Sequence, residues 1–261
     1  MQKRHLDPQR YFNEQALSTE KYVLPFIQNI KSIDNTLNIL EIGCGEAGNL
    51  KPFLDLGCKC TGVDLSSSKI EKGKTYYASH PQVDNLKLIS EDIYKTKDFH
   101  SQFDVVIIRD VIEHIHDQDK FLHLLKDLLT PNAVVFVAFP PWQSPFGGHQ
   151  QVCTNKLLSL LPYFHLLPIP LYKKLLKTFG ETSDKIVGLL EIKETGISLE
   201  RFESLSLKND YHILSKTLYF INPNYEVKFG LKPRLLTKML ASIPYFRNYF
   251  CTCGYYLLSR S

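Results

Sequence analysis

Two apolar runs in the middle of the chain constrain its fold more than any other feature. Residues 103–109 read FDVVIIR and residues 133–139 read AVVFVAF, so neither run alternates between apolar and polar side chains. A strand that is apolar on both faces is typical of a parallel sheet covered by helices on both sides. The amphipathic segment 119–129 between the two runs is long enough to be the helix that parallel strands require as a connection. The chain is therefore expected to have an α/β core.

The alternation of strand and helix extends through the first 140 residues. Further strands are expected at 38–42, 60–64 and 86–90, and helices at 18–30, 49–55 and 68–79. Strand patterns return at 211–221 and 254–259, after a mainly helical stretch over 154–208. Right-handed crossovers turn such a series into a doubly wound, Rossmann-like sheet.

The length of 261 residues fits one elaborated domain better than two independent ones. We expect a single domain over 1–261, with a core at 1–150, an inserted helical lid at 151–210 and closing strands at 211–261. The hydrophobic share of 44% and the charged share of 22% are ordinary for a globular protein, which excludes disorder and a coiled coil.

The N-terminal residues contain no apolar signal region, and no stretch reaches the roughly 18 apolar residues of a membrane span. Six cysteines occur without the spacing of a zinc site, and nothing in the sequence calls for disulfides. We therefore expect a cytoplasmic protein whose cysteines serve as small buried apolar residues.

A glycine-rich loop follows the first strand. Gly43, Gly45 and Gly48 form G-x-G-x-x-G before a helix, a spacing that allows a tight turn and close approach of the backbone to a ligand. The motif serves nicotinamide dinucleotides and other adenosyl cofactors alike, so by itself it leaves an NAD-dependent oxidoreductase as an alternative.

Carboxylates around this loop favour S-adenosylmethionine. Asp64 ends the second strand, where a carboxylate accepts hydrogen bonds from ribose hydroxyls. Glu41 lies beside the first glycine, where its charge would repel a pyrophosphate but attract an ammonium and a sulfonium group. Asp92 follows the third strand, and we expect it to accept the adenine amino group while Ile93 contributes an N–H and an apolar contact.

With these motifs in order, the chain resembles the class I S-adenosylmethionine-dependent methyltransferases of the ubiquinone-biosynthesis-like kind. The matching segments are EIGCGEAG (41–48), VDLS (63–66), EDI (91–93) and FDVVIIRDVIEHI (103–115). The resemblance covers about residues 10–140. It implies a seven-stranded sheet in the order 3-2-1-4-5-7-6, with strand 7 antiparallel.

The resemblance also implies roles for individual residues. The loop of Gly43, Cys44 and Gly45 would hold the methionine half, Asp64 with Leu65 the ribose, and Asp92 with Ile93 the adenine. Arg109 and Asp110 would pass beside the methyl group. Tyr11, with Phe12, would cover the cofactor.

Three side chains after the fourth and fifth strands are candidate catalytic residues: Asp110, His114 and His149. Ligands of such sheets bind at this edge, and histidine titrates near neutral pH. Two alternatives remain. In the first, His114 only orients its loop; in the second, Asp110, Glu113 and His114 hold a divalent ion, as a similar run does in some ubiquinone-type O-methyltransferases. We assign no metal.

The second half of the chain points toward the acceptor. Residues 1–150 hold 16 Lys and Arg against 19 Asp and Glu, whereas residues 151–261 hold 15 against 8. The apolar segment 157–179 is expected to roof a hydrophobic acceptor site, contact a membrane or a second subunit, or pack as core. We expect O-methylation of a small-molecule, sugar or lipid-linked acceptor, and no nucleic acid. The remaining alternative is a catalytically silent, cofactor-binding partner subunit.

Overall fold

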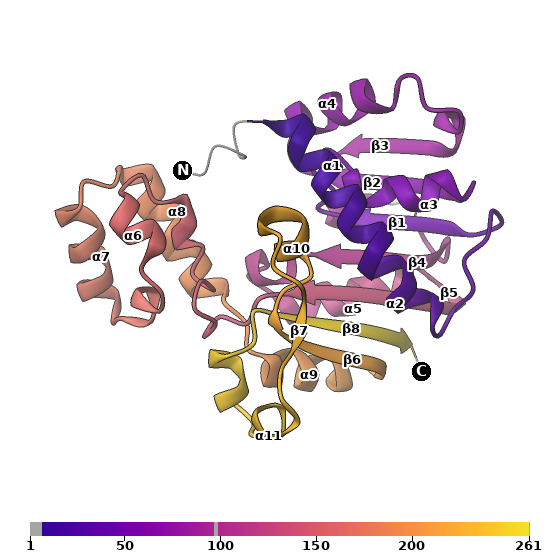
Figure 1. Cartoon of the computed structure of the whole chain (residues 1–261). Helices are drawn as coiled ribbons and strands as arrows, with labels where there is room; N and C mark the ends of the chain where they lie inside the picture. The colour runs from indigo at the N-terminus through magenta and orange to yellow at the C-terminus, as the bar shows by residue number, and fades with distance from the viewer. Residues whose placement is uncertain (1–6, 97–98, 261) are drawn as a thin grey trace.

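The computed structural model describes residues 7–96 and 99–260 and has one mixed sheet at its centre (Figure 1). The strands are β1 (Asn38–Ile42), β2 (Lys59–Asp64), β3 (Leu86–Ser90), β4 (Phe103–Arg109), β5 (Leu129–Phe139), β6 (Tyr211–Ile221), β7 (Arg234–Leu235) and β8 (Cys253–Arg260). Their order in the sheet is β3-β2-β1-β4-β5-β8-β6-β7.

The predicted topology is confirmed except at one edge. Strands β1 to β5 pair in parallel, and the last strand, β8, lies antiparallel between β5 and β6. The sheet has eight strands and not seven, because the two-residue strand β7 pairs with the outer edge of β6. A strand of two residues is too short to show a hydrophobic pattern, and it was therefore not predicted.

Helices cover both faces of the sheet, as the doubly apolar strands require. The helices are α1 (Pro8–Ser18), α2 (Leu24–Gln28), α3 (Lys51–Asp55), α4 (Ser67–Tyr77), α5 (Gln118–Leu128), α6 (Lys156–Leu160), α7 (Ile169–Thr178), α8 (Ser183–Thr195), α9 (Leu199–Lys208), α10 (Asn224–Phe229) and α11 (Lys238–Ala241). Val105 and Ile107 of β4 pack toward α1–α4, and Val106 and Ile108 pack toward α5 and α9. This two-sided core fixes the edge at which the parallel strands end.

The N-terminal helix begins earlier than the sequence predicted. Helix α1 starts at Pro8, where the Asp7 carboxylate accepts the Arg10 backbone N–H at 3.0 Å. The predicted start near Ser18 instead falls at the junction with a π-helical turn over residues 19–23. An aspartate followed by proline is a normal helix start, and the apolar pattern of α1 is too weak to reveal it.

Helices α6, α7 and α8 form a lobe beside the sheet (Figure 1). Their buried apolar side chains make a separate small cluster, which includes Leu158, Tyr172 and Leu189. Helix α9, which falls within the predicted lid, packs on the sheet through Leu199 and Phe202. We use the word lid below for α6–α8 alone.

All six cysteines are buried, as expected. Among residues 7–96 and 99–260, no helix is long and apolar enough to cross a lipid bilayer.

Candidate active site

The glycine loop is shaped by backbone conformations that favour glycine. Gly43 and Gly45 have φ angles of 70° and 56°. A Cβ atom at Gly43 would lie 2.5 Å from Val111 Cγ2, in the loop that follows β4. The backbone N–H groups of Gly43 and Cys44 both donate to the Val63 carbonyl, at 2.8 and 3.1 Å. The loop is therefore held between β2 and the segment after β4, the position predicted for the cofactor's methionine half.

Asp64 joins the glycine loop to the end of β2. Its two carboxylate oxygens accept the backbone N–H groups of Gly45 and Ser66, each at 2.8 Å. The neighbouring Leu65 side chain is 78% exposed. A carboxylate and an apolar side chain therefore lie together at the edge of the sheet where the resemblance predicts the ribose. The role of Asp64 and Leu65 in ribose binding stays a prediction.

Glu41 is a buried carboxyl group with one hydrogen-bonded oxygen. Its Oε1 accepts from Asn49 Nδ2 at 2.6 Å, whereas Oε2 has no hydrogen-bond partner among the described residues. Burial raises the pKa of Glu41 to about 8, against the lowering effects of Asn49 and Arg109. A buried, unsatisfied acceptor beside the glycine loop fits a cationic ligand group, and an ammonium fits it far better than a pyrophosphate.

Arg109, at the end of β4, is a structural centre of this region. Nη1 donates to Thr19 Oγ1 at 3.1 Å and to Asn49 Oδ1 at 2.8 Å. Nη2 donates to Ser18 Oγ at 2.7 Å and also bonds Asn224 Oδ1. The guanidinium thus connects α1, the glycine loop and α10. The predicted contact of Arg109 with the cofactor stays a prediction.

Helix α1 lies over the carboxyl ends of β1 and β4 (Figure 1). Tyr11 lines a small pocket there with Asp110, and Lys228 lies 5.8 Å from its ring. Burial and the Asp110 carboxylate raise the pKa of the Tyr11 hydroxyl well above its usual range. Phe12 instead packs against Tyr77 at 5.3 Å between ring centroids. Tyr11 therefore remains the α1 residue placed to cover a cofactor.

The predicted adenine contacts lie after β3. The Asp92 carboxylate accepts the Tyr94 backbone N–H at 3.0 Å, and the Ile93 side chain is buried in the core. Cys44 is buried too, and its burial raises the thiol pKa. The side chains of Ile93 and Cys44 are therefore part of the core, whereas Asp92 remains partly exposed.

Asp110 occupies a strained backbone position immediately after β4. Its φ angle is 55°, which is uncommon outside glycine, and its N–H donates to the Ala138 carbonyl at 2.8 Å. The side chain is exposed at the edge of the sheet. Strain of this kind is found where the surrounding structure fixes a functional side chain.

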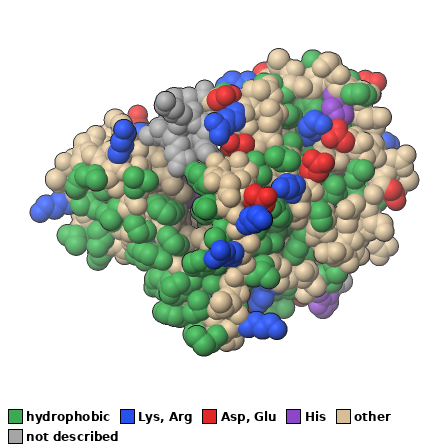
Figure 2. Space-filling model, viewed as in Figure 1, with side chains coloured by type: hydrophobic (Ala, Val, Ile, Leu, Met, Phe, Trp, Pro, Cys, Tyr) green, Lys and Arg blue, Asp and Glu red, His purple; other side chains and the backbone are tan. Residues whose placement is uncertain are grey.

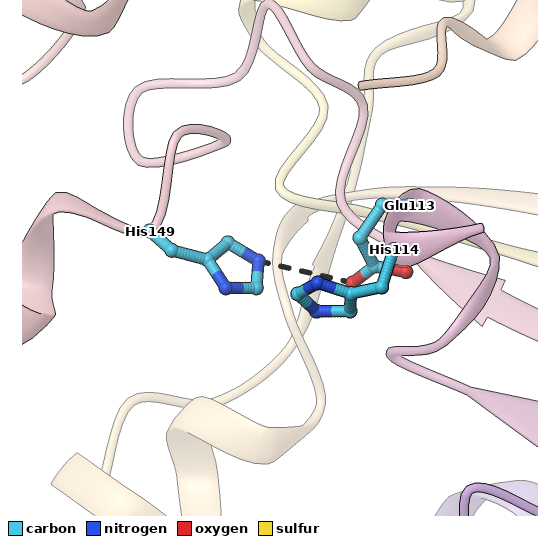
Figure 3. A group of neighbouring side chains, drawn as sticks. All are labelled: Glu113, His114 and His149. Carbon is cyan, nitrogen blue, oxygen red and sulfur yellow. Dashed lines mark ion pairs between the residues drawn. The ribbon is translucent and has the colours of Figure 1, made fainter. Parts of the chain in front are cut away.

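Glu113, His114 and His149 face one another across the gap between two loops (Figure 3). The first two belong to a 3-10 turn over 112–114, and His149 ends the loop after β5 with a φ angle of 54°. His149 Nε2 lies 3.8 Å from Glu113 Oε1, and the two imidazole centroids are 4.9 Å apart. The structure thus brings together His114 and His149, two of the three predicted catalytic residues.

Burial sets the protonation of this cluster. Burial lowers the pKa of His149 to about 4, with His114 adding to the effect, and it lowers the pKa of His114. Burial and the Asp110 charge raise the pKa of Glu113 well above its usual range. Neither Glu113 carboxyl oxygen has a hydrogen-bond partner among the described residues. Two neutral imidazoles beside a buried carboxyl group can accept a proton or bind a cation. The ligand atoms lie within 4.8 Å of one another, so these side chains could also hold a metal ion.

Glu113 is the member of this cluster whose contact with His149 the sequence did not predict. It appeared there only in a metal-binding alternative with Asp110 and His114, and the structure pairs it with His149 instead. Glu113 and His114 could have been recognised in the sequence as an adjacent Glu-His pair after a buried strand. The position of His149 could not, because it depends on the conformation of a distant loop.

A cavity of about 320 Å³ lies between this cluster and the lid. Its lining includes His114 and, from α8, Leu189, Glu191 and Ile192. Trp142, in the loop after β5, is engaged elsewhere: its ring packs edge-on against His165 at 4.6 Å, and Lys193 Nζ lies 5.1 Å from the ring centroid. The acceptor-sized space is therefore lined by α8 and not by Trp142.

The sequence of the core matches a known domain model. Residues 40–135 match the methyltransferase domain family, a span that contains the glycine loop, Asp64, Asp92 and the segment after β4. The chain carries a class I methyltransferase domain. This confirms the resemblance stated above, and the cofactor of this class is S-adenosylmethionine.

Relatives of this methyltransferase domain include ubiquinone biosynthesis O-methyltransferases. The one from Rhodopseudomonas palustris is 34% identical over 116 residues, which are 43% of this chain and 44% of that protein. The one from Pelagibacter ubique is 31% identical over 112 residues, 42% of this chain and 45% of that protein. The match thus spans less than half the length of this chain and of these relatives.

Solved structures share the fold over nearly the whole chain. Geranyl diphosphate C-methyltransferase from Streptomyces coelicolor, solved with S-adenosyl-L-homocysteine, superimposes with a TM-score of 0.58 over 93% of this chain and 79% of that chain. The sequence identity is 12%, so this likeness supports the fold of the methyltransferase domain and not an acceptor.

Proposed function

We propose that this chain transfers the methyl group of S-adenosylmethionine to a hydroxyl oxygen of a small-molecule, sugar or lipid-linked acceptor. The observation that carries the proposal is the cluster of Glu113, His114 and His149, which lies between the end of β4 and the lid cavity. We also propose a cytoplasmic location, which fits cysteines that serve as small buried apolar residues.

The cofactor side would hold its ligand through groups that the fold has already oriented. We propose that Glu41 accepts from the ammonium group, Asp64 from the ribose and Asp92 from the adenine amino group. The cofactor supplies an electrophilic methyl carbon on a sulfonium, whose thioether leaves without charge. The glycine loop and Tyr11 would then position that carbon at the end of β4.

The acceptor side would remove one proton. As the hydroxyl oxygen bonds to the methyl carbon and the carbon–sulfur bond breaks, the hydroxyl proton passes to a neutral imidazole, His149 or His114. The Glu113 carboxyl group, 3.8 Å from His149 Nε2, would orient that imidazole. A lid of apolar helices would exclude water from this step.

A methyl-transfer screen tests this proposal. The purified chain is incubated with S-adenosylmethionine and with small-molecule and lipid extracts, and S-adenosylhomocysteine formation is measured. The matched controls are Asp64→Ala and Asp84→Ala, two aspartates of which only the first borders the glycine loop. We expect turnover by the native chain and by Asp84→Ala but not by Asp64→Ala.

Two outcomes would reject the proposal. Tighter binding of NAD than of S-adenosylhomocysteine would favour an oxidoreductase, although the buried carboxylate of Glu41 disfavours a pyrophosphate. Cofactor binding without turnover of any acceptor would favour a catalytically silent partner subunit.

A further inference from the structure

A large apolar surface remains outside the function proposed above. It is made of side chains that are each at least 39% exposed. They are Leu157, Leu160, Leu161, Ile169 and Leu171 from the lid, and Met239, Ile243, Tyr245, Phe246 and Tyr249 from the segment around α11. We call these ten residues the apolar face.

The two parts of the apolar face lie side by side. The Tyr163 hydroxyl of the lid donates to the Tyr249 carbonyl at 2.9 Å, and the two rings are 6.5 Å apart between centroids. Figure 2 shows hydrophobic side chains gathered over the lid and continuing below it over the α11 region. Soluble monomers rarely expose apolar surface on this scale without a partner.

The outer segment is held firmly while its apolar side chains face solvent. Arg247 is buried and bonds Glu200 at 2.8 Å and Glu203 at 3.0 Å. Glu200 also accepts the Tyr245 backbone N–H at 2.8 Å, and Tyr245 keeps a φ angle of 63°. The ion pairs beneath the segment therefore fix an outward-facing turn, in which the Tyr245 side chain is 70% exposed.

The two stretches that carry the apolar face are basic, whereas the exposed acidic residues of the lid, Asp184, Glu191 and Glu194, lie on α8. Neither residues 151–180 nor residues 227–261 contain an Asp or a Glu. The exposed basic side chains in these stretches that flank the face are Lys156, Lys173, Lys174, Lys177, Lys232, Arg234 and Lys238. In the view of Figure 2 no acidic side chain lies within the apolar surface.

From this combination we propose that the apolar face docks on the surface of an anionic lipid membrane. Leucine, phenylalanine and methionine side chains enter the acyl boundary, tyrosines suit the interface, and lysines at the rim pair with acidic headgroups. A second copy of the chain fits less well, because an isologous contact would bring two basic rims together. The inference does not depend on which acceptor is methylated.

Vesicle co-sedimentation of the full chain tests the proposal. We expect binding to vesicles of phosphatidylcholine with about one third phosphatidylserine, and at least tenfold weaker binding to pure phosphatidylcholine or at high salt. The double variant Met239→Ser/Tyr245→Ser removes two highly exposed side chains of the face, and the variant Lys173→Glu/Lys177→Glu reverses the rim. Each should lower the bound fraction about tenfold.

The matched control is Leu207→Ser. Leu207 is 62% exposed on α9, next to Lys208, which pairs with Asp119 away from the face. It should bind vesicles like the native chain, and every variant should bind S-adenosylhomocysteine with native affinity.

The proposal fails if the native chain does not sediment with acidic vesicles, or if the face variants bind as well as Leu207→Ser. It also fails if the chain is a dimer in solution that the face variants convert to monomer, since the face would then be a self-interface. Neither failure touches the proposed methyl transfer, which is measured separately with a dissolved acceptor and S-adenosylhomocysteine formation.

Discussion

The cofactor side and the acceptor side of this molecule are built in different ways. On the cofactor side, the glycine loop and Asp64 are fixed by short hydrogen bonds at the ends of β1 and β2. On the acceptor side, His114 and His149 come from two loops, and the cavity beside them is closed by a lobe with its own small core. The first side is part of the sheet, whereas the second is attached to it. Binding of the cofactor and turnover of the acceptor should therefore respond to different substitutions.

The largest effect should come from Gly43→Ala. A methyl group there would lie 2.5 Å from Val111, at a φ angle of 70° that disfavours any side chain. We expect affinity for S-adenosylhomocysteine to fall by about 100-fold or more in isothermal titration, since a misplaced loop loses several hydrogen bonds together. Gly188→Ala on α8 is the matched control, because a Cβ atom there meets nothing within 4 Å. Equal losses in both variants would contradict this account.

His149→Ala should affect the other side alone. Loss of the proton acceptor should lower kcat by about 100-fold and leave cofactor affinity unchanged. Because the His149 pKa is about 4, the neutral imidazole predominates at neutral pH, and activity should fall only as the pH drops toward that value. His123→Ala, on the exposed side of α5, should behave like the native chain.

Removal of divalent cations tests directly whether this cluster acts as a proton acceptor or as a set of metal ligands. If methyl transfer disappears with excess EDTA and returns with a divalent cation, Glu113, His114 and His149 act as metal ligands and not as a base. We expect EDTA to leave the rate of the purified chain unchanged.

Glu41 should give cofactor binding a pH dependence. In the free protein its pKa is about 8, so at pH 6 the carboxyl group is mostly protonated and must lose its proton to pair with an ammonium. Affinity for S-adenosylhomocysteine should thus rise between pH 6 and 7.5, by up to about tenfold per pH unit. Glu41→Gln should bind more weakly at pH 7.5 and lose the slope. A slope that survives in this variant would assign the titration to another group.

Gly196→Ala should have the smallest effect on cofactor binding. It therefore tests whether the cofactor side and the acceptor side respond separately. A Cβ atom there would lie 2.7 Å from the Trp142 ring, where the lid joins the core. Crowding of this kind costs about 1–3 kcal/mol of stability, measured by thermal or urea unfolding. Acceptor turnover should fall several-fold while cofactor affinity stays within twofold. A parallel loss of cofactor affinity would mean that the lid and the sheet are one unit.

The same division explains what could be predicted from the sequence. The parallel strands, the glycine loop and Asp64 follow from local patterns, because a doubly apolar strand or a glycine-rich turn needs no distant partner to be recognised. The order of the strands in the sheet was implied by the family resemblance. The pairing of Glu113 with His149 could not be predicted, because it depends on how the loop before His149 folds. Strand β7 and the start of α1 at Pro8 were missed because their apolar patterns are too short or too weak.

The Arg109 network also affects how the molecule assembles. Its partners are Ser18, Thr19, Asn49 and Asn224, so one buried guanidinium joins segments from both ends of the chain. Contacts between such distant segments form late in folding, because long loops must close first. The central segment 40–135 contains the cofactor motifs but only one of these four partners. Expressed alone, it would leave the guanidinium largely unsatisfied, so we expect the isolated segment 40–135 to bind the cofactor more weakly than the full chain, although it contains the motifs.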